Sequence, residues 1–164
     1  MQMNQQSKDM NLIIQLDKNE RLKGNLYLGS VYGADSIKQD NSQKIFSILS
    51  IGNEPENQIK FDPKEFNHMT LEIYDHPNFK ILPFFETAIS FINQELQENN
   101  LLIHCFAGAS RSSTIVIAYL MKEHKMSFLE AFNLAKSKRQ KTNPNQGFLE
   151  QLKQYENILK YQQQ

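Results

Sequence analysis

The sequence contains one cysteine, no tryptophan and no excess of either charge. A lone cysteine cannot form a disulfide within the chain, which fits a reducing compartment, so we expect a cytoplasmic protein that can also be nuclear. Eighteen basic side chains balance eighteen acidic ones, and the net charge therefore gives no reason to expect a nucleic-acid partner. No apolar run approaches the roughly 18 residues of a membrane-spanning helix, so we expect no membrane insertion.

The 164 residues predict one folded domain that can bury a core without disulfides or a structural metal. Residues 1–9 are polar and rich in glutamine and asparagine. We expect them to form a disordered N-terminal tail that plays no part in the fold. The folded domain is expected to span residues 10–161.

Short segments with β-branched or aromatic residues alternate with amphipathic ones along the chain. Strands are predicted at 12–16, 25–30, 44–50, 69–73 and 101–104. Helices are predicted at 82–96 and 112–122, from a capping box at 127–130, and after 143–145. This alternation favours an α/β fold with a central, mainly parallel twisted sheet flanked by helices.

The stretch "HCFAGASRSS", residues 104–113, joins the last predicted strand to an apolar helix. A strand that ends in a tight loop before a helix aims backbone N–H groups and the positive helix end at one point, where an anion can bind. Gly108 can adopt conformations that other residues avoid, and the planar guanidinium of Arg111 can hold two oxygens of a phosphate. The same field favours the thiolate form of Cys105, which would be a nucleophile aimed at phosphorus.

The pattern His-Cys-x-x-Gly-x-x-Arg-Ser resembles the signature of the cysteine-dependent protein tyrosine phosphatase superfamily. The segments "NLYLGS", "KIFSIL" and "PNQGFLEQLKQYE" resemble its dual-specificity branch, and most of all the small atypical members. The resemblance covers about residues 22–156. It implies a cysteine-phosphatase-like fold, with the catalytic domain over 10–161.

The resemblance also implies a reaction and a set of roles. Cys105 would attack the phosphoryl group, Arg111 would hold its oxygens, Asp75 would protonate the leaving oxygen, and Ser112 would help to expel the thiolate. The substrate phosphate would lie on the loop made of Phe106, Ala107, Gly108, Ala109, Ser110 and Arg111. The expected function is hydrolysis of phosphotyrosine and phosphoserine or phosphothreonine on phosphoprotein substrates through a phosphocysteine intermediate, with no cofactor.

The reaction chemistry requires a general acid, because a serine or tyrosine oxygen leaves poorly unless it is protonated. Asp75 lies in "YDHPNF", just past a predicted strand, and the proline that follows favours an extended loop. Glu72 and Asp62 are the other possibilities. Glu72 falls within the strand pattern and Asp62 opens a more distant loop, so both rank below Asp75.

Structural interpretations of these residues also exist. Cys105 could be a buried thiol, Arg111 an ion-pairing residue, Asp75 a turn residue, and Ser112 a group that satisfies the helix start. His104 is interpreted as a structural neighbour, because adjacent strand residues point to opposite faces. We interpret Asn143 and Asn145 as caps, and predict no metal site because no metal-ligand spacing links Cys105 with His68, His76 and His124.

Two other functions remain open at this stage. One is a phosphatase for phosphoinositides or other non-protein substrates, although lipid-directed relatives commonly carry lysines in the loop and residues 106–110 contain none. The other is a catalytically silent phosphate-binding module. Such a module would need neither the thiol of Cys105 nor the acid Asp75.

Overall fold

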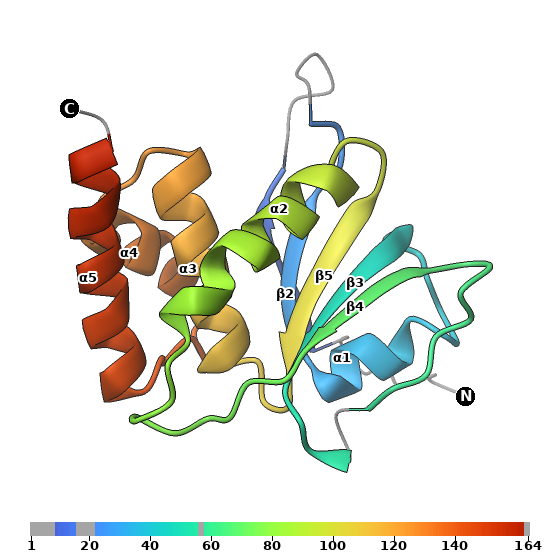
Figure 1. The fold of residues 1–164 in the computed structure, drawn as a ribbon. Helices are drawn as coiled ribbons and strands as arrows, with labels where there is room; N and C mark the ends of the chain where they lie inside the picture. Colours follow the sequence, from blue (N-terminus) through green and yellow to red (C-terminus); the bar gives the residue numbers. More distant parts are fainter. Residues whose placement is uncertain (1–8, 16–21, 56–57, 163–164) are drawn as a thin grey trace.

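The computed structural model describes residues 9–15, 22–55 and 58–162 and is built on a single sheet. The strand order is β1-β2-β5-β3-β4 (Figure 1). The edge strand β1 pairs antiparallel with β2, and every other neighbouring pair is parallel. The strands are β1 (Met10–Ile14), β2 (Leu26–Ser30), β3 (Ile45–Ile51), β4 (Asn67–Leu71) and β5 (Asn100–Cys105). The predicted α/β class with a mainly parallel sheet is confirmed.

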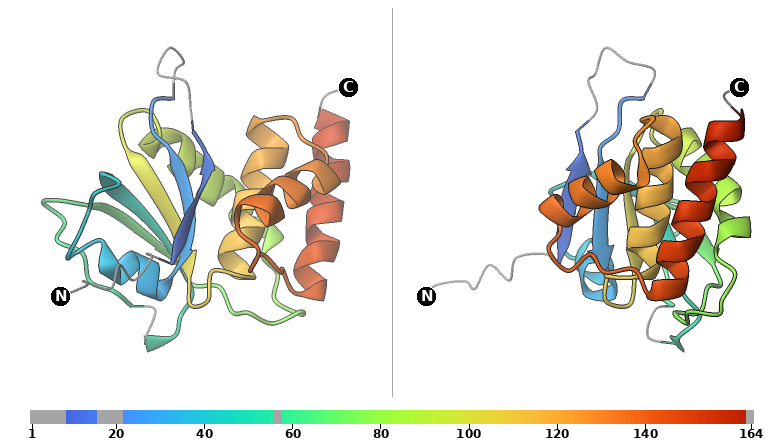
Figure 2. Two further views of the ribbon diagram at one scale, coloured as in Figure 1. Left: turned by 180° about the vertical axis from the view of Figure 1, so that it is seen from behind. Right: turned by 90° about the vertical axis from the view of Figure 1, so that its left-hand side faces the viewer.

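Helices cover both faces of this sheet (Figures 1 and 2). The short helix α1 lies on one face, and α2 to α5 lie on the other. A 3-10 turn, η2, leads into α2, so Pro83 is in a first turn as predicted. The helical elements are α1 (Val31–Ser36), η2 (Leu82–Phe84), α2 (Phe85–Glu95), α3 (Arg111–Glu123), α4 (Phe128–Lys138) and α5 (Gln146–Gln162).

Two hydrophobic clusters hold the layers together, and β5 contributes to both. Leu101, Ile103 and Cys105 belong to the large cluster with α2 to α5, while Leu102 belongs to the smaller cluster with α1. This alternation is the period of two that a strand imposes. As predicted, His104 and Cys105 therefore point to opposite faces of the sheet.

The predicted elements are present, with shifted ends. The strand predicted at 69–73 is displaced, since β4 ends at Leu71, and residue 16 of the first predicted strand lies outside the described residues. The capping box of α4 is confirmed, because the Ser127 side chain accepts from Glu130 N while the Glu130 side chain accepts from Ser127 N. Helix α1 was not predicted, because six residues are too few for helical periodicity to appear.

The predicted N-terminal tail is wrong at its last residue. Asp9 lies beside β2 and α4: its carbonyl oxygen accepts from Ser30 N, and its carboxylate pairs with Arg139 and Lys141. Residues 1–8 of that prediction lie outside the described residues. At the other end, α5 continues one residue past the predicted limit, to Gln162. Among the helices of the described ranges, none combines the length and apolar character that crossing a membrane requires.

Candidate active site

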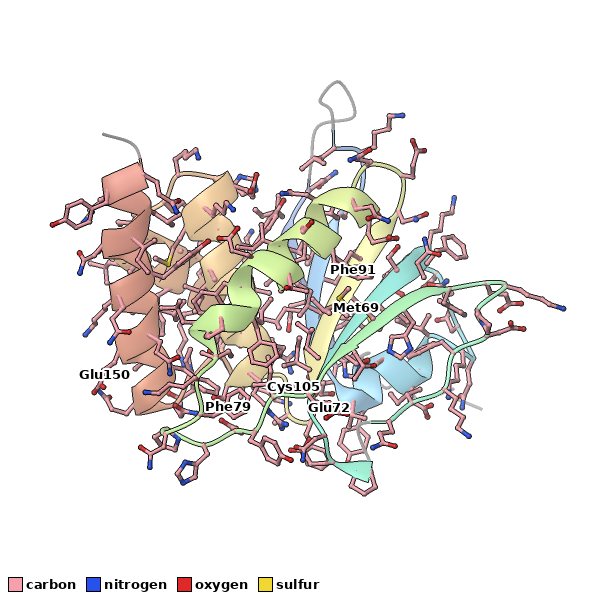
Figure 3. The ribbon with its side chains drawn as sticks, in the orientation of Figure 1. Met69, Glu72, Phe79, Phe91, Cys105 and Glu150 are labelled. Atoms are coloured by element: carbon pink, nitrogen blue, oxygen red, sulfur yellow. The ribbon has the colours of Figure 1, made fainter. Side chains whose placement is uncertain are left out.

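Cys105 is the last residue of β5, at the carboxyl end of the parallel strands (Figure 3). Its side chain is 2% exposed, and its Sγ lies 3.1 Å from the hydroxyl oxygen of Ser112 in the first turn of α3. The chain turns through residues 106–110 before α3 begins at Arg111. The predicted strand, loop and helix are therefore all present, and the thiol lies at the base of the loop.

Gly108 is required for the shape of this loop. Its φ is +65°, in the left-handed region that favours glycine. A Cβ added there would lie 2.3 Å from the carbonyl oxygen of Gly29 on β2. No other residue can therefore occupy position 108 without moving either the loop or the neighbouring strand.

Arg111 is 4% exposed, and its guanidinium forms an ion pair with Glu54. Nη1 lies 2.7 Å from each carboxylate oxygen of Glu54 and 3.4 Å from the carbonyl oxygen of Ile73. Burial alone would lower the pKa of Arg111, but its hydrogen bond with Glu54 raises that pKa overall. Within the described part of the chain Nε has no partner. Nε is therefore a buried donor that an anion bound at the loop could satisfy.

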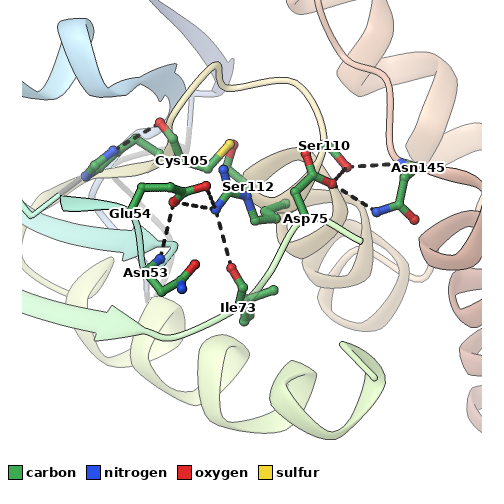
Figure 4. Close-up of polar contacts among 10 residues, drawn as sticks. Asn53, Glu54, Ile73, Asp75, Cys105, Ser110, Ser112 and Asn145 are labelled. Carbon is green, nitrogen blue, oxygen red and sulfur yellow. Dashed lines mark hydrogen bonds and ion pairs between the residues drawn. The ribbon is translucent and has the colours of Figure 1, made fainter. Parts of the chain in front are cut away.

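Asp75 is exposed and lies against the loop (Figure 4). Its Oδ1 accepts hydrogen bonds from Ser110 Oγ at 2.8 Å and from Asn145 Nδ2 at 2.9 Å. The rival carboxylates are placed differently: Asp62 accepts from Lys64 N in its own turn, and Glu72 lines a separate hollow with His68. Of the three predicted candidates, Asp75 is the one that contacts the loop.

A polar chain connects the other face of the sheet to the cysteine backbone. Ser50 Oγ lies 2.8 Å from His68 Nε2 and 2.6 Å from His104 Nε2, while His104 Nδ1 lies 3.4 Å from the carbonyl oxygen of Cys105. Because a carbonyl only accepts, this contact assigns the hydrogen of neutral His104 to Nδ1, and its Nε2 then accepts from Ser50. The structural role predicted for His104 is consistent with these contacts.

We expect His104 to make folding stability fall in mild acid. Burial lowers its pKa from 6.5 to about 4, so below pH 6.5 the unfolded chain takes up the proton first and stability falls as the pH approaches 4. At pH 5 the loss amounts to about 2 kcal/mol. Urea denaturation of wild type and His104→Gln at pH 7.5 and 5.0 should give a smaller pH effect in the variant.

His68 does not obscure this comparison. Burial lowers its pKa too, which gives a pH effect of the same sign, and His68 is retained in His104→Gln. An equal loss of stability in both proteins would contradict the assignment to His104.

Three contacts at the site involve residues that the sequence analysis did not single out for function. Glu54 follows β3 and pairs with Arg111, Ser50 joins the two histidines, and Asn145 donates to Asp75. The cap predicted at Asn145 is confirmed, since its Oδ1 accepts from Phe148 N. The side-chain amide of Asn145 therefore caps the start of α5 and also contacts Asp75.

No metal centre is apparent at the site. Within the ranges that the structure describes, His, Cys, Asp and Glu side chains form no group of three or more that could hold a metal ion. The polar side chains that lie near the thiol and the loop include those of Arg111, Asp75, Ser110 and Ser112. This set suits an oxyanion.

Residues 26–158 match the family model of the dual specificity phosphatase catalytic domain. The chain belongs to this family. Among relatives in the dual specificity phosphatase family, the dual specificity protein phosphatase MPK-4 of Drosophila melanogaster is 40% identical over 129 residues, covering 78% of this chain and 33% of that protein. The dual specificity protein phosphatase 1B of Arabidopsis thaliana is 36% identical over 138 residues, covering 82% of this chain and 79% of that protein.

A solved structure of the same fold is that of the human tyrosine phosphatase-like serine/threonine/tyrosine-interacting protein. It superposes with a TM-score of 0.79 at 33% identity and covers 92% of this chain and 97% of that one. The predicted cysteine-phosphatase-like fold is thereby confirmed. The chain spans about a third of the length of the first curated relatives that it matches.

Proposed function

We propose that this chain is a protein phosphatase that hydrolyses phosphotyrosine and phosphoserine or phosphothreonine through a phosphocysteine intermediate. The observation that carries the proposal is that four groups meet at one loop. They are the thiol of Cys105, the Nε of Arg111 that is unpaired within the described ranges, the carboxyl of Asp75 and the hydroxyl of Ser112. A nucleophile, an anion clamp and a proton donor are the groups that phosphoryl transfer needs.

In the first step the Cys105 thiolate attacks phosphorus, and the bond between phosphorus and the substrate oxygen breaks. The Nε and Nη2 edge of Arg111 binds two oxygens of the transferring group, because Glu54 already occupies Nη1. Within the described ranges, the hydrogen bonds from Ser110 and Asn145 both end on Oδ1 of Asp75, so Oδ2 carries the proton. That proton passes to the leaving oxygen, which departs as an alcohol or phenol.

In the second step water attacks the phosphocysteine, and the bond between sulfur and phosphorus breaks. Asp75, now a carboxylate, takes a proton from the attacking water. Ser112 Oγ lies 3.1 Å from the sulfur and can donate a hydrogen bond that stabilises the leaving thiolate, while the serine keeps its proton. The products are inorganic phosphate and the original Cys105 thiolate.

Exposed aromatic rings around the loop support a protein substrate. Tyr32 is 69% exposed and Phe106 is 38% exposed, with ring centroids 6.3 Å apart. Tyr74, beside Asp75, is exposed as well. Apolar rings at the rim suit the side chains and backbone of a peptide better than they suit a strongly charged inositol phosphate headgroup.

A phosphoamino-acid assay tests the proposal. Two peptides that differ only in carrying phosphotyrosine or phosphothreonine should both release phosphate with wild type and not with Cys105→Ser. A soluble phosphoinositide headgroup is the comparison substrate. A higher kcat/KM for that headgroup than for either peptide would favour the non-protein phosphatase, and phosphate binding without any turnover would favour the silent module.

A further inference from the structure

Arg139 follows α4 directly and contacts carbonyl oxygens of the loop 106–110. Its side chain is 2% exposed. Nε donates to the carbonyl oxygen of Gly108 at 2.8 Å, and Nη2 donates to that of Ala107 at 3.1 Å. A buried guanidinium is costly unless its donors are used, and here two of its nitrogens bind successive carbonyls of one loop.

These two bonds fix which way the loop amides point. A trans peptide is planar, with its C=O and N–H on opposite sides. Holding the carbonyl oxygen of Ala107 outward turns the N–H of Gly108 inward, and holding that of Gly108 does the same for Ala109. Arg139 thereby directs two backbone donors toward the place where the phosphoryl oxygens bind.

Backbone amides hold the carbonyls on either side of this pair. Val31 N donates to the carbonyl oxygen of Phe106 at 3.0 Å, and Asn143 N donates to that of Ala109 at 2.7 Å. Those two bonds join main-chain groups and do not use the side chain of Arg139. The middle of the loop depends instead on the side chain of Arg139.

The third nitrogen of Arg139 connects the loop to the edge strand. Nη1 lies 3.0 Å from Asp9 Oδ1 and 2.9 Å from Asn11 Oδ1. Asp9 also holds β2, through the bond from Ser30 N to its carbonyl oxygen. The exposed Lys141 binds the other carboxylate oxygen of Asp9 at 3.1 Å.

We propose that Arg139 is a positioning residue of the phosphate-binding loop and that Asp9, next to β1, sets its orientation, so that this edge of the sheet tunes phosphate affinity. The inference rests on the proposed function, because it assumes that the loop binds the phosphoryl group. Arg139 does not contact the phosphate. It acts through the direction of the amides of Gly108 and Ala109.

The test measures binding of inorganic phosphate by calorimetry to the full chain, at a temperature where circular dichroism shows each variant folded. Arg139→Met should weaken phosphate binding by about tenfold or more, as expected when charge-assisted bonds are lost. Arg139→Lys should lose less, since an ammonium can hold one carbonyl but not both. Asp9→Asn, which keeps Arg139, should weaken binding by about two- to fivefold.

Lys141→Met is the matched control, because Lys141 shares Asp9 with Arg139, and its phosphate affinity should equal that of wild type. If Arg139→Met does not fold, Arg139→Lys and Asp9→Asn decide the matter. Lowered melting temperatures with phosphate affinities equal to that of Lys141→Met would overturn the proposal and leave Arg139 only a stabilising role. Wild type that binds phosphate but hydrolyses no phosphopeptide would instead overturn the proposed function.

Discussion

We expect the Cys105→Ser variant to lose hydrolysis of an aryl phosphate by at least about 10⁴-fold while its affinity for inorganic phosphate stays close to that of wild type. Sulfur supplies the covalent step, because a serine hydroxyl at this position stays protonated near neutral pH and is a weak nucleophile. In the proposed mechanism phosphate is bound by the loop amides and Arg111 instead. Serine fits the buried site without a clash, since it is slightly smaller than cysteine.

Two measurements on the same samples check this result. Release of p-nitrophenol gives the turnover, and calorimetric titration with phosphate gives the affinity. Ser112→Ala is the matched control: it removes the hydroxyl 3.1 Å from the sulfur but keeps the nucleophile, so it should slow turnover without abolishing it. Turnover by Cys105→Ser near the wild-type rate would show that the nucleophile is another group.

The centre of the site could be predicted because it is local in sequence. Cys105, Gly108 and Arg111 lie within seven residues, between a strand and a helix whose apolar patterns are both clear. Local geometry then brings them together whatever the rest of the fold does. Asp75 could be predicted from its place after a strand. The preceding strand β4 runs parallel to β3 and ends at the same edge of the sheet as Cys105.

The supports of the site could not be predicted in this way. Glu54 reaches Arg111 across 57 residues, and Asn145 reaches Asp75 across 70. Such contacts depend on strand order and on where α5 begins, and neither has a signature in a single sequence. Asn145 shows the difficulty most clearly. Its predicted capping bond is local and correct, while its second bond, to Asp75, appears only in the folded chain.

Helix α1 was missed for a related reason. Its six residues begin at the cap formed by Ser30, whose Oγ accepts from Gly33 N at 3.3 Å. A single turn and a half shows no stripe of apolar residues, so the signal was a lone serine before a valine. The packing of Ala34 and Ile37 into the smaller cluster is tertiary information. The same holds for Asp9, whose polar neighbours in sequence suggested a tail.

We expect Asp75→Asn to reduce kcat on phosphotyrosine and phosphothreonine peptides by roughly 10²- to 10⁴-fold, the usual contribution of general acid and base catalysis. An amide at position 75 can still accept the hydrogen bond from Ser110, but it has no acidic proton to give to the leaving oxygen. The loss should shrink as the leaving group improves, because a stabilised phenolate departs without protonation. A series of aryl phosphates with graded leaving-group pKa values would therefore converge for wild type and variant at its most acidic end.

The Glu72→Gln variant is the matched control. It makes the same change of carboxylate to amide on the same segment. Because Glu72 lines a separate hollow with His68, the kcat of this variant should stay within about twofold of wild type. Asn145→Ala removes the donor to Asp75 Oδ1 and the cap of α5 but keeps the acid. It should give a smaller loss of kcat than Asp75→Asn, with a weaker dependence on the leaving group. If Glu72→Gln shows the large, leaving-group-dependent loss and Asp75→Asn does not, Glu72 is the acid.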